Sequence, residues 1–282
     1  MISIVIPSMG REQRLDVILT QFESEIPDDA EIIVVMDEQH IIEKRKKSLV
    51  RRMDKAHPKT KFILSKIRGC WRSTSLGFDH AKNEFIMWTA DDINPHPGWF
   101  RRATERFEKV FPDGLGLMIL NDLHMLDQVA GHAMTTKRFL WVLFEEAKFP
   151  PRFYHLFCDT LVADWAKSIN RCHFCENAIL EHMHYSIGKM EQDETSISAR
   201  RGEPETDDKI VKDDLDTVWY FQGGRGRALA RLNQGENTMT KKKTTKKTEE
   251  KVPVFVEPVD LPTIKKPRTP SGQSKNQSIQ SK

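Results

Sequence analysis

The chain lacks the two glycine-rich signatures that most often mark a phosphate-binding loop. No G-x-G-x-x-G follows the first apolar run, Ile2–Ile6, and the sequence contains no G-x-x-x-x-G-K-[ST]. Dinucleotide-binding dehydrogenases and P-loop NTPases depend on these motifs, because their glycines let backbone N–H groups approach a pyrophosphate. The sequence therefore argues against both classes.

Cysteine is scarce, and long apolar runs are missing. The four cysteines (Cys70, Cys158, Cys172 and Cys175) are too few and too far apart for a disulfide scaffold. The opening segment 1–7 has no basic n-region and is too short in apolar residues for a signal peptide. No run approaches the roughly 18 apolar residues that a membrane-spanning helix needs. We expect a soluble, cytoplasmic protein.

Positive charge is concentrated at the C-terminal end. Residues 236–282 carry 11 Lys/Arg against 5 Asp/Glu, an excess of six, so residues 1–235 carry −3 of the formal net charge of +3. This tail is rich in Lys, Thr, Pro, Ser and Gln, a composition typical of disorder, and its charge suits an acidic partner. We expect a main domain over 1–195, an extension over 196–235 and a disordered basic tail over 236–282.

Strands and helices alternate along the first 95 residues. Apolar runs predict strands at 2–6, 31–36, 61–65 and 85–89, and helical spacing of apolar residues predicts helices near 15–22 and 39–56, with a loop and short helix at 68–81. This alternation is typical of a parallel sheet with right-handed crossovers. The strands end at Ser8, Asp37 and Asp91, so one edge of the sheet should collect these polar side chains.

The later part of the main domain continues the α/β pattern. We expect helices near 99–111, 136–146 and 159–167, and strands at 116–120, 131–135 and 178–185. The strand at 116–120 ends in Asn121 and Asp122. A short helical segment is expected at 228–232.

Asp91 and Asp92 follow a buried strand directly. Carboxyl ends of strands are where open α/β sheets bind ligands. Two adjacent carboxylates oppose joint ionisation unless a cation lies between them, and a divalent metal that also holds a phosphate would resolve the conflict. The alternative is a polar turn whose carboxylates cap the next helix.

Two histidines, His182 and His184, lie two residues apart in an expected strand, so both imidazoles would point to one face. Beside carboxylates they suit a borderline cation such as Mn²⁺. A competing possibility is a zinc knuckle formed by Cys172 and Cys175 with the same two histidines, although strand pairing explains these residues as well.

The order of several motifs resembles family 2-like glycosyltransferases with the GT-A fold, of the small bacterial and phage type, over about residues 1–195. The resemblance lies in the opening strand with its turn at 7–11, the strand ending at Asp37, the segment 85–99 around Asp91, the segment 155–159 and the segment 181–189 with Asp193. It implies a mixed, mostly parallel α/β sheet flanked by helices.

The resemblance also implies a set of site residues. Donor contacts fall on Pro7, Ser8, Arg11, Asp37, Arg68, Ser75 and Asp92; metal contacts on Asp91, His182 and His184; and the general base on Asp159. The implied reaction moves a sugar from a nucleotide-sugar to an acceptor hydroxyl with Mn²⁺ or Mg²⁺, with inversion. The chain departs from the D-x-D pattern at its first position, which is Thr89, and it has Thr160 where relatives often carry a second acidic residue.

Three alternatives remain open at this point. Asp159 could act as a helix N-cap before Thr160. The domain could be a non-catalytic nucleotide- or glycan-binding module tethered by the basic tail, and the missing first aspartate favours this. A nucleotidyltransferase on a similar sheet is a third possibility, although its Gly-rich basic loop is absent.

Overall fold

The computed structural model describes residues 1–38, 46–67, 69–149, 157–191, 228 and 231–232 of the chain. Its eight strands are β1 (Ile2–Ser8), β2 (Glu31–Asp37), β3 (Thr60–Ser65), β4 (Phe85–Trp88), β5 (Ile93–Pro95), β6 (Leu117–Asn121), β7 (Ala133–Thr136) and β8 (Cys172–His182). The helices are α1 (Glu12–Glu25), α2 (Lys46–Ala56), α3 (Cys70–His80), α4 (Trp99–Val110), α5 (Lys137–Phe144) and α6 (Cys158–Ser168), and the short 3₁₀ turn η3 covers Tyr185–Ile187.

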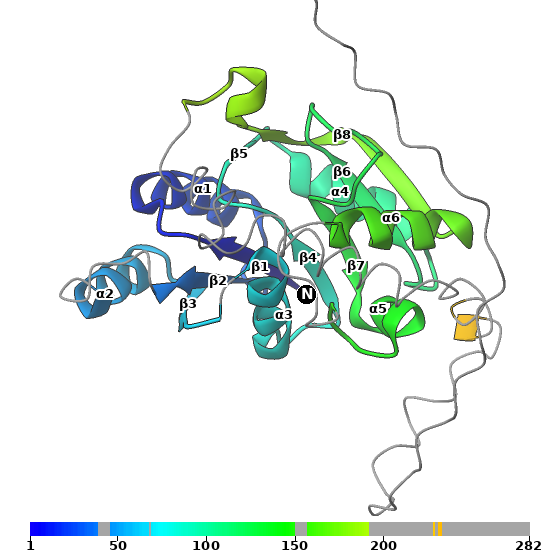
Figure 1. Cartoon of the computed structure of the whole chain (residues 1–282), viewed down its shortest axis with the longest axis horizontal. Coiled ribbons are helices and arrows are strands. Elements are labelled where there is room, and N and C mark those ends of the chain that lie inside the picture. Colours follow the sequence, from blue (N-terminus) through cyan, green and yellow to red (C-terminus); the bar gives the residue numbers. More distant parts are fainter. Residues whose placement is uncertain (39–45, 68, 150–156, 192–227, 229–230, 233–282) are drawn as a thin grey trace, which may run out of the picture. The chain divides into compact units, whose positions relative to one another are not determined.

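The strands form one mixed sheet in the order β3-β2-β1-β4-β7-β6-β8-β5 (Figure 1). The N-terminal half is parallel, as the strand–helix alternation predicts, because β1 pairs in parallel with both β2 and β4 and β2 pairs in parallel with β3. The second half mixes directions: β7 is antiparallel to β4 and β6, whereas β8 runs parallel to β6 and antiparallel to β5. This mixed α/β sheet confirms the expected fold class.

Helices cover both faces of the sheet because successive strand residues point to opposite sides. Along β1, Ile4 and Ile6 belong to one buried cluster and Val5 to the other. The first cluster takes in the apolar stripes of α1, α2 and α4, and the second takes in those of α3, α5 and α6. Each helix therefore buries one face against the sheet, and the strand ends are left as the place where polar side chains meet.

Helix α3 approaches the sheet most closely at a glycine. A Cβ atom on Gly77 would lie 2.3 Å from Cγ1 of Val5, so only glycine lets this helix lie against the middle of β1. The close packing fixes the N-terminal end of α3 over the end of β1.

Most predicted elements are confirmed within a few residues, and two boundaries differ. β8 begins at Cys172, six residues before the predicted start, and ends at His182, so His184 lies outside the strand. Of the expected helix near 39–56, only Lys46–Ala56 is among the described residues. No helix in the described ranges has both the length and the apolar character that a membrane crossing requires.

The described residues near the C-terminal end pack against α5. Ala228 is buried and helical, and the Arg231 guanidinium donates from Nε to the Val142 carbonyl at 2.6 Å and from Nη2 to the Leu143 carbonyl at 2.9 Å. These contacts attach part of the predicted extension to the main body. The predicted boundary at residue 195 stays a prediction, and the predicted disordered tail lies outside the described residues.

Candidate functional site

Strand pairing brings the ends of β1 and β4 together. The parallel register places Val5 opposite Trp88, and the N–H of Thr89 continues the ladder by donating to the Val5 carbonyl at 3.1 Å. As a result the Ser8 hydroxyl, at the end of β1, donates to Oδ2 of Asp91 at 2.7 Å. The expected gathering of strand-end polar groups is therefore present.

Arg11 lies between the two adjacent carboxylates. It precedes α1, and its Nη1 is 2.7 Å from Oδ1 of Asp91 and 3.1 Å from Oδ2 of Asp92. The side chains of Arg11, Asp91 and Asp92 are 11%, 7% and 13% exposed, so these three charges are largely shielded from solvent. One guanidinium nitrogen thus partly compensates two carboxylates, as a cation at this position would.

The two carboxylates respond differently to this environment. Burial raises the pKa of Asp91, and the charge of Arg11 opposes this. Burial also works against the ionised form of Asp92, but His182 and then Arg11 outweigh it and hold the pKa of Asp92 below its ordinary value. Asp92 therefore keeps its negative charge at neutral pH.

Asp92 faces His182 across the β5–β8 pair. The register puts Ile93 opposite His182, and the Met183 N–H donates to the Asp92 carbonyl at 2.7 Å. The two side chains then lie with Oδ1 of Asp92 3.4 Å from Nε2 of His182, which is ion-pair distance without hydrogen-bond geometry. This Oδ1 is buried and has no hydrogen-bond partner among the described residues.

A second histidine reaches the same place from the β6–β7 connection. His132 is 4% exposed, and its ring centre lies 5.3 Å from that of His182. Its Nδ1 is 2.9 Å from Oγ1 of Thr89, the residue at the first position of the D-x-D pattern. Burial, followed by the nearby His182, lowers the pKa of His132 to about 4, so its imidazole is neutral at pH 7.

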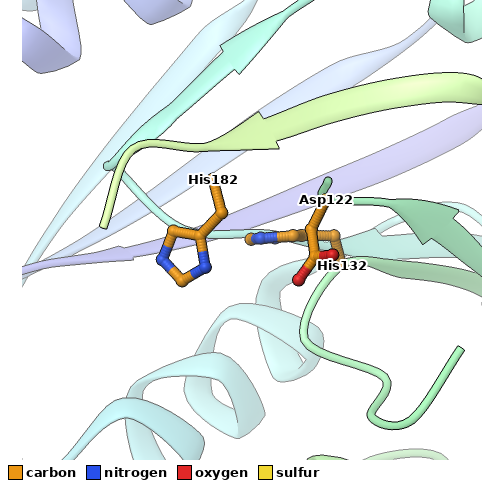
Figure 2. Close-up of side chains that lie close together, drawn as sticks. All are labelled: Asp122, His132 and His182. Carbon is orange, nitrogen blue, oxygen red and sulfur yellow. The ribbon is translucent and has the colours of Figure 1, made fainter. Parts of the chain in front are cut away.

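Asp122 joins these histidines from the end of β6. Figure 2 shows Asp122, His132 and His182 close together, and one ligand atom from each lies within 4.8 Å of the other two. The Asp122 carboxylate also accepts N–H bonds from His124, Met125 and Leu126 at 2.8–3.1 Å. Although burial works in the opposite direction, these N–H groups keep the pKa of Asp122 below its ordinary value, so the group is ionised.

His184 lies beside this group but outside the three-residue cluster. Its ring centre is 5.2 Å from that of His182, so the two imidazoles are neighbours as predicted. However, His184 caps η3, and its Nδ1 is engaged by the hydroxyl of Ser186 at 2.6 Å and by the N–H of Ser186 at 3.2 Å. Only its other ring nitrogen could therefore reach a cation.

Asp159 lies in the first turn of α6. It is half-buried, and its Oδ1 accepts the N–H of Thr160 at 2.9 Å. The N-cap of this helix is Phe157, so the alternative that Asp159 is the N-cap was wrong. Burial raises the pKa of Asp159.

Cys70 connects Asp159 to the strand-end carboxylates. Burial, and then the charges of Asp159, Asp92 and Asp91, raise the pKa of its thiol to about 12. The Cys70 thiol, at the N-terminus of α3, is therefore near the predicted base and the two strand-end carboxylates.

The remaining predicted donor contacts are spread along the same edge. Pro7 lies in β1 and Asp37 ends β2, where it is 5% exposed. Ser75 is buried on α3 and donates to the Phe149 carbonyl at 2.9 Å, so its hydroxyl already has a partner. Arg68 lies outside the described residues. These donor contacts stay predictions.

The alternative zinc knuckle does not form. Cys175 belongs to the buried cluster on one face of the sheet, whereas Cys172 packs against the cluster on the opposite face. Residues three apart in a strand point to opposite sides, so the two sulfurs cannot share one ion.

The residues at the end of β4 fit a divalent cation. A buried carboxylate oxygen without a hydrogen-bond partner faces an imidazole nitrogen, and hard or borderline cations prefer these two donor types. Asp91, by contrast, has Oδ1 engaged by Arg11 and Oδ2 by Ser8. The geometry thus favours Asp92 over Asp91 as the carboxylate nearest the predicted histidine ligand.

Solved structures with the same fold are known. A mannosyltransferase from Pyrobaculum calidifontis in complex with GDP-Man and Mn²⁺ aligns with a TM-score of 0.50 and 15% identity, over 83% of this chain and 74% of that chain. Glucosyl-3-phosphoglycerate synthase from Mycobacterium tuberculosis, in complex with Mn²⁺, UDP and glucosyl-3-phosphoglycerate, aligns with a TM-score of 0.50 and 10% identity, over 78% and 80%. Comparison with curated proteins gave no match.

The fold of this chain is the GT-A fold of these two structures. Residues 3–139 match the family model "Glycosyl transferase family 2". The match covers β1 to the start of α5, which includes Arg11, Asp91, Asp92, Asp122 and His132.

Sequence reasoning did not select Asp122 and His132 as site residues. Asp122 carried a signal, since it follows a predicted strand directly. His132 carried none, because it reaches the site only through the pairing of β6 with β7, where the Leu120 N–H donates to the His132 carbonyl at 2.9 Å.

Proposed function

We propose that the protein transfers a sugar from a nucleotide-sugar donor to an acceptor hydroxyl in a reaction that requires a divalent cation and inverts the anomeric centre. One observation carries this proposal: two adjacent strand-end carboxylates, Asp91 and Asp92, lie between a buried arginine and a histidine. Two solved relatives of the same fold are complexes with Mn²⁺ and a nucleotide or nucleotide-sugar, which supports the same ligands here.

Asp92 and His182 would hold the cation. When bound, such a cation stabilises the negative charge that develops on a departing diphosphate. Arg11 lies next to this position and can add charge-assisted hydrogen bonds to phosphate oxygens. Pro7, Ser8 and Asp37, at the ends of the two neighbouring strands, would contact the nucleoside and orient the donor.

Asp159 is the proposed general base. Its charge, like the charges of Asp91 and Asp92, raises the pKa of the Cys70 thiol, so Asp159 lies in the neighbourhood of the two strand-end carboxylates. A carboxylate whose pKa burial has raised is a stronger base than one in water, and a positioned base contributes roughly 10²–10⁴-fold to the rate. Attack from the side opposite the leaving diphosphate would give inversion.

The proposal is tested with the full chain and a panel of nucleotide-sugars, with release of the nucleoside diphosphate as the readout in Mn²⁺ and in EDTA. We expect cation-dependent release from one donor and loss of that release in Asp92→Asn. Asp54→Asn, an exposed aspartate on α2, is the control and should match the unmodified protein.

Calorimetry separates this proposal from the non-catalytic module. Binding of a nucleoside diphosphate in the presence of Mn²⁺, together with no cleavage of any nucleotide-sugar in the panel, would favour the binding module. Turnover that is equal in EDTA and in Mn²⁺ would contradict the cation requirement.

A further inference from the structure

We propose that Asp122 and His132 complete the cation site begun by Asp92 and His182, which makes it a nitrogen-rich site for a borderline divalent metal such as Mn²⁺, Co²⁺ or Zn²⁺ in preference to Mg²⁺. The inference rests on the proposed function only for the role of the metal in sugar transfer. Metal binding itself is a separate property of these four residues.

The four side chains come from four different parts of the sheet and lie near one another. Asp122 follows β6, His132 precedes β7 and His182 ends β8, and one ligand atom of each lies within 4.8 Å of the other two (Figure 2). Asp92 adds Oδ1, which is 3.4 Å from Nε2 of His182. Separations of this size bring Asp122, His132 and His182 within reach of a single ion after small side-chain adjustments, and Asp92 adjoins them through His182.

The orientation of His132 suits a ligand. Its Nδ1 pairs with the Thr89 hydroxyl at 2.9 Å, which leaves Nε2 for the cluster. Metal-binding histidines usually hold the second ring nitrogen in such a hydrogen bond, because it fixes the tautomer and the ring orientation. Thr89 would thus orient a metal ligand, His132, whereas an aspartate at the first D-x-D position could itself be a ligand.

One oxygen of Asp92 lacks a hydrogen bond, although the carboxylate is at ion-pair distance from Arg11 and His182. Asp92 is 9% exposed, and its Oδ1 is buried without a hydrogen-bond partner among the described residues. A buried carboxylate oxygen left unsatisfied is costly, and buried charges are normally paired or bind a metal.

Backbone contacts fix three of the ligands in advance. The His182 N–H donates to the Asp122 carbonyl at 2.9 Å, and the Met183 N–H donates to the Asp92 carbonyl at 2.7 Å. The loop after Asp122 closes on its own carboxylate through three N–H groups, yet a carboxylate offers about four lone-pair sites, so one remains for an ion.

The donor types decide the class of metal. Imidazole suits Zn²⁺ and other transition metals, whereas Mg²⁺ prefers an octahedral set of oxygens and keeps several waters. Asp91 accepts hydrogen bonds from Ser8 and Arg11, and it is not part of the cluster of Asp122, His132 and His182. The ligand set therefore differs from the one predicted from the sequence, Asp91 with His182 and His184.

Metal binding by the full chain without any nucleotide tests the inference. Co²⁺ is the probe, because its visible absorption reports nitrogen ligation, and titration calorimetry with Mn²⁺ and Mg²⁺ gives the selectivity. We expect one Co²⁺ per chain, with affinity at least about tenfold lower in His132→Gln and in His182→Gln. His80→Gln, which changes an exposed histidine on α3, should keep the unmodified affinity.

Two results would overturn the inference: no Co²⁺ binding by the unmodified chain, or a Co²⁺ affinity in both histidine variants that equals that of the unmodified chain. His182→Gln guards against a folding failure of the more buried His132 variant, since the His182 side chain is 21% exposed. Co²⁺ binding that depends on His132 without any donor turnover would contradict the proposed function and leave this inference standing. Mn²⁺-dependent turnover that is unchanged in His132→Gln would support the proposed function and contradict this inference.

Discussion

Replacing Arg11 by methionine should make the stability of the protein depend on a divalent cation. In the unmodified chain, Nη1 of Arg11 contacts Asp91 at 2.7 Å and Asp92 at 3.1 Å, and the three side chains are at most 13% exposed. Methionine keeps much of the apolar stem but removes the charge. Two neighbouring carboxylates would then be buried without this counter-ion.

The magnitude follows from that burial. Removing one partner of a buried ion pair costs about 3–5 kcal/mol, because the remaining charge is left uncompensated. For a domain of this size each kcal/mol shifts Tm by about 2–4 °C, so Tm should fall by about 6–20 °C. A cation at 100 times its Kd would raise the free energy of unfolding by about 2.7 kcal/mol. This increase should be larger in the variant, because the guanidinium that repels the ion is gone.

The assay is urea unfolding of both proteins in EDTA and in Mn²⁺. The control is Arg52→Met, whose partner Glu12 is at 2.9 Å but whose side chain is 64% exposed, so it should lose at most about 1 kcal/mol. If Arg11→Met loses no more than this control, or if Mn²⁺ stabilises variant and unmodified protein equally, the electrostatic account of the site is incorrect.

Two further predictions concern Asp159 and Gly77. Asp159→Asn should lower sugar transfer by roughly 10²–10⁴-fold while donor binding measured by calorimetry is unchanged; a smaller loss would contradict its role as base. Because burial raises the pKa of Asp159, the kcat/KM profile of the unmodified enzyme should fall as pH decreases with an acid limb above the ordinary carboxyl pKa, and a limb at or below that value would contradict the assignment. Gly77→Ala should lower the free energy of unfolding by about 1–3 kcal/mol, because its Cβ would lie 2.3 Å from Val5. Val5→Ala in the same chain should restore part of this loss. Unchanged stability in urea would show that α3 can move away from β1.

The parallel half of the fold could be predicted from the sequence because its information is local. The apolar run ending at Ser8 and the run ending before Asp91 each identify a strand, and parallel pairing then brings their ends together without further knowledge. The apolar spacing along α4 likewise predicts a helix, and its large residues Trp99 and Phe107 are buried as that spacing requires.

The antiparallel half and the histidine cluster could not be predicted in the same way. His132 is 43 residues from its partner Thr89, and only the return of the chain through β7 places the two side by side. The register of β8 shifts between Leu120 and Asn121 of its neighbour β6, so alternation along its sequence does not give its true length. Long-range pairing carries this information, and no residue pattern within either segment contains it.

The long strand β8 has a consequence for the motions of the protein. It pairs with β6 in the interior and, past the register shift, with the short edge strand β5 that follows the aspartates. At its end, the amides of His182 and Met183 donate to the carbonyls of Asp122 and Asp92. Their hydrogen exchange should be as slow as that of the central strands. The β8 side of the site is therefore expected to move little, and any motion needed for ligand entry or release would involve other segments.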